Sequence, residues 1–333
     1  MNRRKFLTAT LLSGTGLAWA ARTRAALALT AAETYFSTPA FVPDAGETLI
    51  TVLHTNDQHS QIDPLSDNDR QAGKGGVVRR ATLVKLIRKE NPNTLLLDAG
   101  DAFQGTPYYN LYKGEVEMKA MSAIGYDAMT LGNHDFDYGV EALAAAMKFA
   151  NFDFVSTNYD VRGTALEKRV KPYLLRDLGG LRIGIIGLGI KLEGLNTPDS
   201  YKGVKILDPT TTARAAVTLL REKMACQMVL CASHLGYFPN PKNGDYGDSQ
   251  LAAEVDGIDF IASGHTHTVM KQPVMVTQAG GGLTTIFQVG KSGIYLGRVD
   301  FLVRRNKIVA RAAKLLDNET NFNAKTPSGK GAK

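Results

Sequence analysis

The feature that most constrains the fold is a repeated arrangement in which a short apolar run ends in a cluster of polar residues. From residue 48 to residue 263, these β-rich runs alternate with segments whose apolar residues recur every three or four positions. The predicted strands are 49–54, 94–98, 127–132, 153–158, 182–189, 228–233 and 259–263, and the predicted helices are 77–90, 115–124, 140–150 and 210–225. Strands that alternate with helices indicate an α/β protein.

The pattern changes after residue 270, where the apolar runs follow one another without helical segments between them. They are 273–278, 284–290, 294–303 and 307–313, and Gly-Gly, Lys-Ser-Gly and Arg-Asn-Lys turns separate them. These signals predict an antiparallel meander. An α/β body that finishes in such strands predicts two packed sheets flanked by helices.

The polar clusters at the predicted strand ends share one chemistry, that of imidazole, carboxylate and amide groups. They contain Asp57, His59, Asp101, Asn133, His134, Asp137, His234, His265 and His267. Ligands of open α/β sheets bind beyond the carboxyl ends of the strands, so these side chains predict one shared pocket. Asp-x-His and His-x-His would project both side chains in one direction if the backbone is extended there. Imidazoles and carboxylates bind Zn²⁺, Mn²⁺ or Fe, and there are too many ligands here for a single tetrahedral ion. Two divalent ions bridged by one carboxylate fit the number better.

The motifs HTNDQH, GD, GNHDFD, SHLG and GHTH, in this order, resemble those of the calcineurin-like metallophosphoesterases, and most closely the N-terminal domain of the bacterial 5′-nucleotidase family. The resemblance covers residues 48–303 and implies the metallophosphoesterase fold, a four-layer α-β-β-α sandwich of two mixed sheets with flanking helices. By motif it implies that one metal ion is held by Asp57, His59, Asp101 and His267. It implies that the other is held by Asp101, Asn133, His234 and His265. It also implies a catalytic pair of His134 and Asp137, and it identifies no substrate-binding residue.

The expected reaction is hydrolysis of a phosphate monoester, with nucleotides as the substrates. Two divalent ions, two ligand carboxylates and a bridging hydroxide leave a charge of about +1, which attracts a phosphate group. The hydroxide would attack phosphorus, while His134, kept protonated by Asp137, stabilises the phosphoryl oxygens or protonates the leaving oxygen. We expect Asp135 to be solvated or to support a ligand, and Asp98 to hydrogen-bond a ligand histidine or to act only in the strand end.

The substrate is less well specified than the chemistry. The 5′-nucleotidases carry a C-terminal domain that binds the base, and we expect none in this chain, so a separately encoded subunit would have to supply it. His267 also stands where those enzymes often have an amide residue. A 2′,3′-cyclic-nucleotide phosphodiesterase or a thiosulfohydrolase therefore remains an alternative, as does a non-catalytic metal- or nucleotide-binding protein, although the intact pair of His134 and Asp137 disfavours the last. The tyrosines Tyr108, Tyr109 and Tyr112 either line the pocket or pack.

The N-terminal residues are typical of an export signal. Residues 1–25 have a basic start, a short apolar middle and the small-residue exit Ala18-Trp19-Ala20, and Arg3-Arg4 resembles a twin-arginine signal. We therefore expect a periplasmic or extracellular protein with no stable membrane insertion after cleavage. A linker over 26–47, a metallophosphoesterase domain over 48–316 and a disordered basic tail over 317–333 would follow.

The charge of the chain does not favour nucleic-acid binding. The formal net charge is +7, and the basic start of the chain, Arg3, Arg4 and Lys5, accounts for three of these charges, so that +4 remains without it. Part of that remainder comes from three lysines of the tail. No dense basic stripe remains, so we expect a small phosphorylated substrate and no nucleic acid as the partner.

Overall fold

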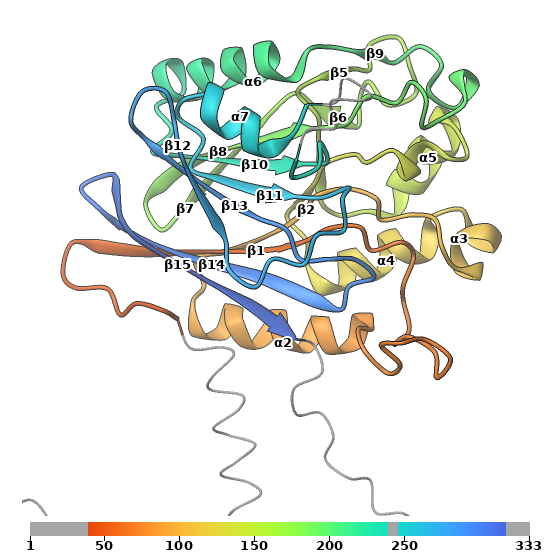
Figure 1. Cartoon of the computed structure of the whole chain (residues 1–333), viewed down its shortest axis with the longest axis horizontal. Helices are drawn as coiled ribbons and strands as arrows, with labels where there is room; N and C mark the ends of the chain where they lie inside the picture. Colours follow the sequence, from red (N-terminus) through yellow and green to blue (C-terminus); the bar gives the residue numbers. More distant parts are fainter. Residues whose placement is uncertain (1–38, 239–245, 318–333) are drawn as a thin grey trace, which may run out of the picture.

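Two large β-sheets pack face to face and carry helices on their outer sides in the computed structural model, which describes residues 39–238 and 246–317 (Figure 1). The predicted export signal, most of the predicted linker and nearly all of the predicted tail lie outside the described residues. No helix among the described residues is long and apolar enough to cross a membrane.

Both sheets are mixed. The seven-stranded sheet has the order β15-β14-β1-β2-β3-β4-β6 and the six-stranded sheet the order β12-β13-β11-β10-β8-β7. The first contains β1 (Glu47–Thr55), β2 (Thr94–Asp98), β3 (Ala128–Met129), β4 (Asp153–Val155), β6 (Val170–Lys171), β14 (Tyr295–Arg304) and β15 (Lys307–Asp317). The second contains β7 (Leu174–Leu178), β8 (Leu181–Leu188), β10 (Met228–Ser233), β11 (Phe260–Ser263), β12 (Val274–Thr277) and β13 (Leu283–Phe287). A small antiparallel pair consists of β5 (Tyr159–Asp160) and β9 (Lys205–Ile206).

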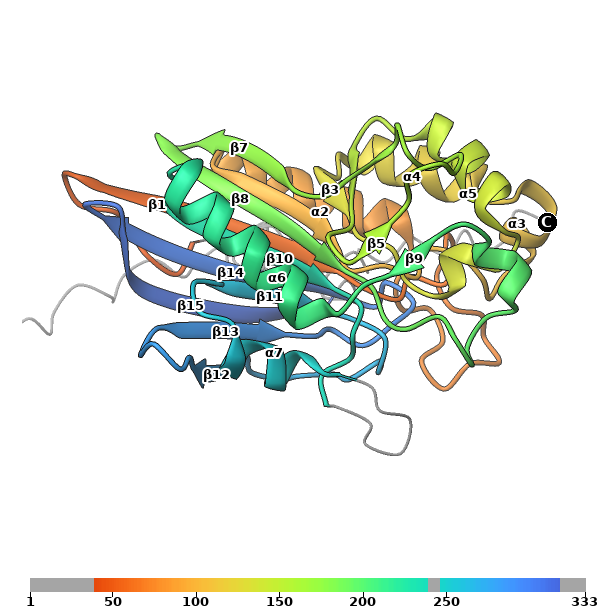
Figure 2. The same ribbon diagram turned by 90° about the horizontal axis from the view of Figure 1, so that it is seen from above.

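The helices cover the outer faces of the two sheets. They are α2 (Val77–Glu90), α3 (Pro107–Tyr112), α4 (Glu115–Ile124), α5 (Val140–Ala146), α6 (Pro209–Thr218) and α7 (Asp248–Glu254). Figure 1 places α2 and α4 on the side of the seven-stranded sheet and α6 and α7 on the side of the six-stranded sheet. Seen from above, α3, α4 and α5 gather towards one end of the molecule (Figure 2).

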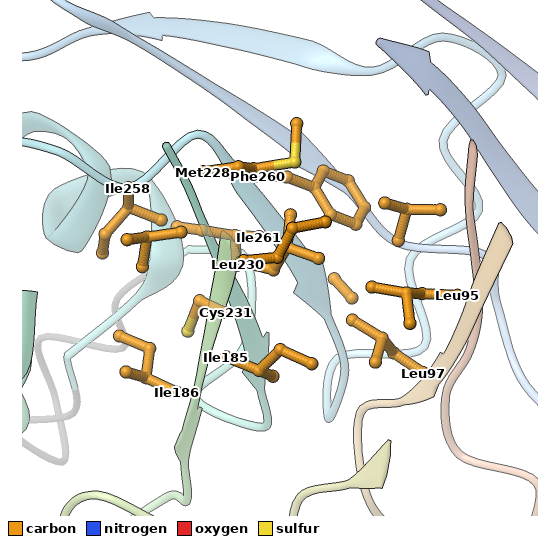
Figure 3. Packing of buried hydrophobic residues seen from close by; sticks show 14 of the residues in the cluster. Leu95, Leu97, Ile185, Ile186, Met228, Leu230, Cys231, Ile258, Phe260 and Ile261 are labelled. Atoms are coloured by element: carbon orange, nitrogen blue, oxygen red, sulfur yellow. The ribbon is translucent and has the colours of Figure 1, made fainter. Parts of the chain in front are cut away.

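The apolar runs become strands because the sheets bury them on both faces. Between the sheets, Leu95 and Leu97 of β2 belong to the same fully packed cluster as Ile185, Leu230 and Phe260 of the six-stranded sheet (Figure 3). A second cluster joins the outer face of the seven-stranded sheet to α2, α4 and α5. These layers confirm the predicted four-layer sandwich of two mixed sheets.

The predicted helices occur where the sequence places them, but two of them lose regularity at their ends. Asp208 accepts a hydrogen bond from the backbone nitrogen of Thr211 at 2.7 Å, and Pro209 occupies the first turn, so α6 begins as predicted. The predicted helix 210–225 continues beyond α6 as a π-helix over Leu219–Lys223. The predicted helix 140–150 similarly divides into α5 and a 3₁₀ turn over Met147–Phe149.

The predicted antiparallel meander after residue 270 is wrong. β12 pairs with β13 in the six-stranded sheet, whereas β14 pairs with β15 and β1 in the seven-stranded sheet. The segment 288–294 therefore passes from one sheet to the other. Turn residues specify pairing between neighbouring strands, but the choice of sheet depends on contacts with β11 and β1, which are distant in sequence. Local pattern also did not identify α3, α7 or the short strands β5, β6, β7 and β9.

Candidate metal centre and catalytic pair

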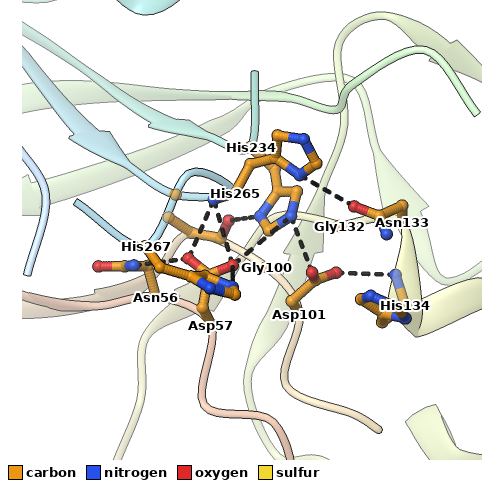
Figure 4. Close-up of polar contacts among 12 residues, drawn as sticks. Asn56, Asp57, Gly100, Asp101, Gly132, Asn133, His134, His234, His265 and His267 are labelled. Atoms are coloured by element: carbon orange, nitrogen blue, oxygen red, sulfur yellow. Dashed lines mark hydrogen bonds and ion pairs between the residues drawn. The ribbon is translucent and has the colours of Figure 1, made fainter. Parts of the chain in front are cut away.

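The structure brings all seven predicted ligand residues to one place, at the carboxyl ends of strands from both sheets. Figure 4 labels all of them except His59. Asp57 and His59 follow β1, Asp101 follows β2, Asn133 follows β3, His234 follows β10, and His265 and His267 follow β11. Six of them, all except Asn133, form two groups, each with ligand atoms within 4.8 Å of one another. One contains Asp57, His59 and His267, and the other contains Asp101, His234 and His265.

The backbone at these ligand residues is left-handed. The extended backbone that would let Asp-x-His and His-x-His project both side chains in one direction is therefore not present. The φ angles are 49° at Asp57, 48° at His59, 56° at Asp101, 69° at His265 and 53° at His267. Such conformations cost about 1–3 kcal/mol each and persist only where the surroundings hold them. Here the backbone nitrogens of Asp57 and His59 donate to the carbonyls of Gly100 and Asp101, at 2.9 and 3.0 Å.

The first group presents its donors towards a common point. The Nε2 atoms of His59 and His267 lie 2.9 Å apart, and Nε2 of His267 lies 3.3 Å from Oδ1 of Asp57. Two imidazole nitrogens that face one another next to a buried carboxylate fit a shared cation.

The second group has the same character. Nε2 of the fully buried His234 lies 3.1 Å from Oδ2 of Asp101 and has no hydrogen-bond partner within the described part of the chain. Its Nδ1 lies 2.7 Å from the carbonyl of Ala99, which orients the ring with Nε2 towards the cluster. Oδ1 of Asn133 lies 3.1 Å from Nδ1 of His265 and adds an amide oxygen to the group. The residues therefore fit two divalent ions bound by nitrogen and oxygen ligands.

The electrostatics also favour cations. Burial lowers the pKa of His234, but the carboxylates of Asp101 and Asp57 outweigh that effect and raise this pKa to about 10. The buried carboxylates thus require a positive partner, either a proton or a metal ion. Burial lowers the pKa of His265 to about 4 and also lowers that of His59, so these imidazoles are neutral, as metal ligands must be.

The predicted catalytic pair lies beside the two groups. Nδ1 of His134 is 3.0 Å from Oδ2 of Asp137, and both side chains are partly exposed. The hydrogen bond to Asp137, opposed by burial, raises the pKa of His134. The backbone nitrogen of His134 donates to Oδ1 of Asp101 at 2.8 Å, so the pair is tied to the candidate bridging carboxylate.

Close packing of the loops that follow β2 and β3 explains why glycines occur at positions 100 and 132. A Cβ atom at Gly132 would lie 2.2 Å from Oδ1 of Asp101, and one at Gly100 would lie 2.6 Å from the backbone nitrogen of Gly132. Asp135 is not solvated, which was one of the two expectations for it. It is buried and accepts hydrogen bonds from the backbone nitrogens of Gly132, Asp101 and Ala102, at 2.8 to 3.1 Å. Asp135 therefore joins the two loops that follow β2 and β3.

Asp98 hydrogen-bonds residues around the end of β2 and makes no hydrogen bond to the ring of His234. It accepts hydrogen bonds from Thr55, Gln58 and the backbone of Gly100, and the ring of the ligand candidate His234 bonds to Ala99 instead. The tyrosines differ among themselves. Tyr109 is buried and stacks on Phe103, with ring centroids 4.9 Å apart, whereas Tyr112 is exposed.

Sequence reasoning missed the residues that hold the loops in place. Asn196 donates to the carbonyl of Asn133 at 3.0 Å, and Asn56 donates to Oδ2 of Asp57 at 2.6 Å. Gln288 contacts the loop that carries His265 and His267. Asn56 could have been found by its place in HTNDQH, but Gln288 has no comparable local signal.

Comparison with known proteins agrees with this geometry. The family model of calcineurin-like phosphoesterases matches residues 50–269. The 5′-nucleotidase of Rattus norvegicus is 33% identical over an alignment of 305 positions, which covers 84% of this chain and 51% of the relative. The 5′-nucleotidase of Vibrio cholerae is 31% identical over 78% of this chain and 50% of its own length.

A solved structure of a 5′-nucleotidase also resembles this chain. The crystal structure of a 5′-nucleotidase precursor from Thermus thermophilus superposes with a TM-score of 0.71 at 32% identity, over 81% of this chain and 54% of that one. The chain thus spans about half the length of the curated relatives it matches. From the order of its motifs, the two ligand groups and these matches, the chain belongs to the calcineurin-like phosphoesterase family.

Proposed function

We propose that the protein is a phosphoesterase with two divalent metal ions and that it hydrolyses phosphate monoesters, with 5′-nucleotides as the preferred class. The observation that carries this proposal is the meeting of two ligand groups next to the ion pair of His134 and Asp137. Each group alone could hold an ion for structural reasons. A partly exposed imidazole poised beside both groups is what a reaction on a bound ester needs.

The ligand assignment follows from the two groups. We assign Asp57, His59, Asp101 and His267 to one ion, and Asp101, Asn133, His234 and His265 to the other. Zn²⁺, Mn²⁺ and Fe all suit this mixture of imidazole, carboxylate and amide donors. When bound, such ions lower the pKa of water and offset the charge of a phosphate group.

The remaining chemistry belongs to side chains of this chain. Asp137 favours the imidazolium form of His134 through the hydrogen bond at Nδ1, which leaves Nε2 as the donor towards a substrate. A proton held there can stabilise a phosphoryl oxygen or pass to the leaving oxygen. Asp101 fixes the backbone of His134, so the donor and the candidate ligands keep one relative position.

The preference for nucleotides rests on the relatives, several of which are named 5′-nucleotidases. The match covers about half of their length, and we propose no base-binding residue within it. A phosphodiesterase that acts on cyclic nucleotides is the second candidate, since His267 stands where the 5′-nucleotidases often have an amide residue. We also propose export by the twin-arginine route, which Arg3 and Arg4 support.

Metal analysis and a substrate panel test this function. The purified protein should contain two divalent ions and should hydrolyse adenosine 5′-phosphate faster than a 2′,3′-cyclic nucleotide or a thiosulfonate ester. Chelation should abolish hydrolysis and added metal should restore it. His134→Ala should lose about 10²- to 10⁴-fold in rate on the nucleotide, whereas His54→Leu, a change of the one histidine inside a strand, should remain active. Two bound ions without hydrolysis of any phosphate ester would contradict the proposal.

A further inference from the structure

The loop between β11 and β12 has to hold two histidines in a costly conformation. His265 and His267, one from each ligand group, both have left-handed φ angles, of 69° and 53°. A residue with a Cβ atom keeps this conformation only where neighbouring contacts hold it. The backbone nitrogen of His265 donates to Oδ2 of Asp57 at 2.9 Å, but that contact supports only one side of the loop.

The side-chain amide of Gln288 supports the rest of the loop. Gln288 follows β13 directly and is fully buried. Its Nε2 donates to Oγ of Ser263 at 2.7 Å and to the carbonyl of Gly264 at 2.6 Å. Its Oε1 accepts from Oγ1 of Thr266 at 3.0 Å and from the backbone nitrogen of Thr268. One amide thus bonds to residues on both sides of His265 and His267 and uses both of its donors and two acceptor positions.

The residues after Gln288 connect this loop to the other sheet. They belong to the segment that passes from β13, in the six-stranded sheet, to β14, in the seven-stranded sheet. Asn56 accepts from the backbone nitrogen of Val289 at 3.0 Å and donates to the carbonyl of Gly290 at 2.6 Å. The same side chain donates to Oδ2 of Asp57 (Figure 4). A single crossing segment therefore contacts one ligand loop from each sheet.

We propose that Gln288 is a positioning residue of the metal centre, which sets the loop of His265 and His267 against the loop of Asp57 and His59. This inference rests on the proposed function, because it takes these histidines as metal ligands. The physical reason is that the two loops come from different sheets, so hydrogen bonds within either sheet cannot align them. Residues that orient metal ligands typically affect metal affinity by about 10- to 100-fold when they are replaced.

A second buried glutamine supplies a matched control. Gln278, 7% exposed, donates to the carbonyl of Ile258 at 2.7 Å and to Oγ1 of Thr284 at 2.9 Å, and it accepts from the backbone nitrogen of Gly257 at 3.0 Å. It supports residues just before β11, at the opposite end of that strand from the ligand loop. Gln278→Met and Gln288→Met therefore remove similar sets of buried hydrogen bonds, and only the second is next to the candidate metal centre.

The experiment compares zinc affinity in the full chain by competition with a chromophoric chelator, together with the Tm of each metal-free protein. Both variants should unfold at a lower temperature than the wild type. Gln288→Met should bind zinc about 10- to 100-fold more weakly, whereas Gln278→Met should bind it with wild-type affinity. Unchanged affinity in Gln288→Met, or equal losses in both variants, would overturn the positioning role.

A milder variant covers the case in which Gln288→Met does not fold. Thr266→Val removes one of the four hydrogen bonds of the amide at an exposed position, so the core stays intact. It should weaken zinc binding in the same direction by a smaller factor, and wild-type affinity in this variant would overturn the inference. If the wild-type protein binds no zinc, manganese or iron, the proposed function fails and this inference fails with it.

Discussion

Protonation of His54 should destabilise the protein as the pH falls. His54 lies in β1 with no exposed surface, and the rings of Phe260 and Phe287 are each 5.4 Å from its own, measured between centroids. Neither ring nitrogen has a hydrogen-bond partner among the described residues. Burial lowers the pKa of this imidazole from 6.5 to about 3 in the folded protein. The folded state therefore holds His54 neutral under conditions in which the unfolded chain is already protonated.

The sign and size of the effect follow from these two pKa values. Between pH 6.5 and pH 3 the unfolded state binds more protons than the folded state, so the free energy of unfolding decreases as the pH falls through this window. From one group with these pKa values, the loss between pH 8 and pH 5 is about 2 kcal/mol. Below both pKa values the loss reaches about 5 kcal/mol, at about 1.4 kcal/mol for each unit of difference.

Urea unfolding of wild type and His54→Leu at pH 8 and pH 5, in the presence of a chelator, measures this loss. The wild type should lose about 2 kcal/mol more than the variant between the two pH values. Buried carboxyl groups such as Asp135 and Asp248, whose pKa values burial raises to about 8 and about 7, titrate in both proteins, so their contribution cancels in the comparison. Parallel losses in the two proteins would refute the reasoning, because His54 would then carry no depressed pKa.

Three further predictions concern the centre and the export signal. Asp101→Ala should lower the metal content of both sites and abolish hydrolysis, and near-normal metal in that variant would remove its role as the bridge. His134→Ala should keep the metals yet lose about 10²- to 10⁴-fold in rate on an ester with a poor leaving group, and it should lose less on a nitrophenyl phosphate. Asp137→Asn should show smaller losses in rate on both esters. Equal losses on the two esters would count against proton donation by His134. Replacing Arg3 and Arg4 by lysine should leave folded precursor in the cytoplasm, as cell fractionation would detect, and undiminished export would argue against the twin-arginine route.

Much of the fold could be read from periodicity. β2, α2 and α4 have the bounds that the apolar pattern predicts. The two helices each bury one face at helical spacing, and β2 is a continuous run that is buried on both faces, so both signals are local in the sequence. The candidate ligands could also be predicted, since polar groups that follow buried strands end up at a common sheet edge. The strand predicted over 127–132 was too long. It ends at Met129, because the next residues form a loop that leads to the candidate metal centre. In that loop a Cβ atom at Gly132 would collide with Asp101.

The amino-acid sequence by itself determined most of the strands and helices, the chemistry of the candidate ligands and the order of the motifs, because each depends on neighbouring residues or on residue type. Only the tertiary structure decided how the last four strands divide between the sheets. It also determined the burial of Asp135 and the hydrogen bonds of Gln288 to the loop of His265 and His267. Those features depend on hydrogen bonds between residues far apart in the chain, such as Asn56 and Gly290, and no local pattern records which distant partners will meet. The physical reason is that a buried polar group must find a partner wherever the packed sheets leave one, and the packing of the whole chain determines that place.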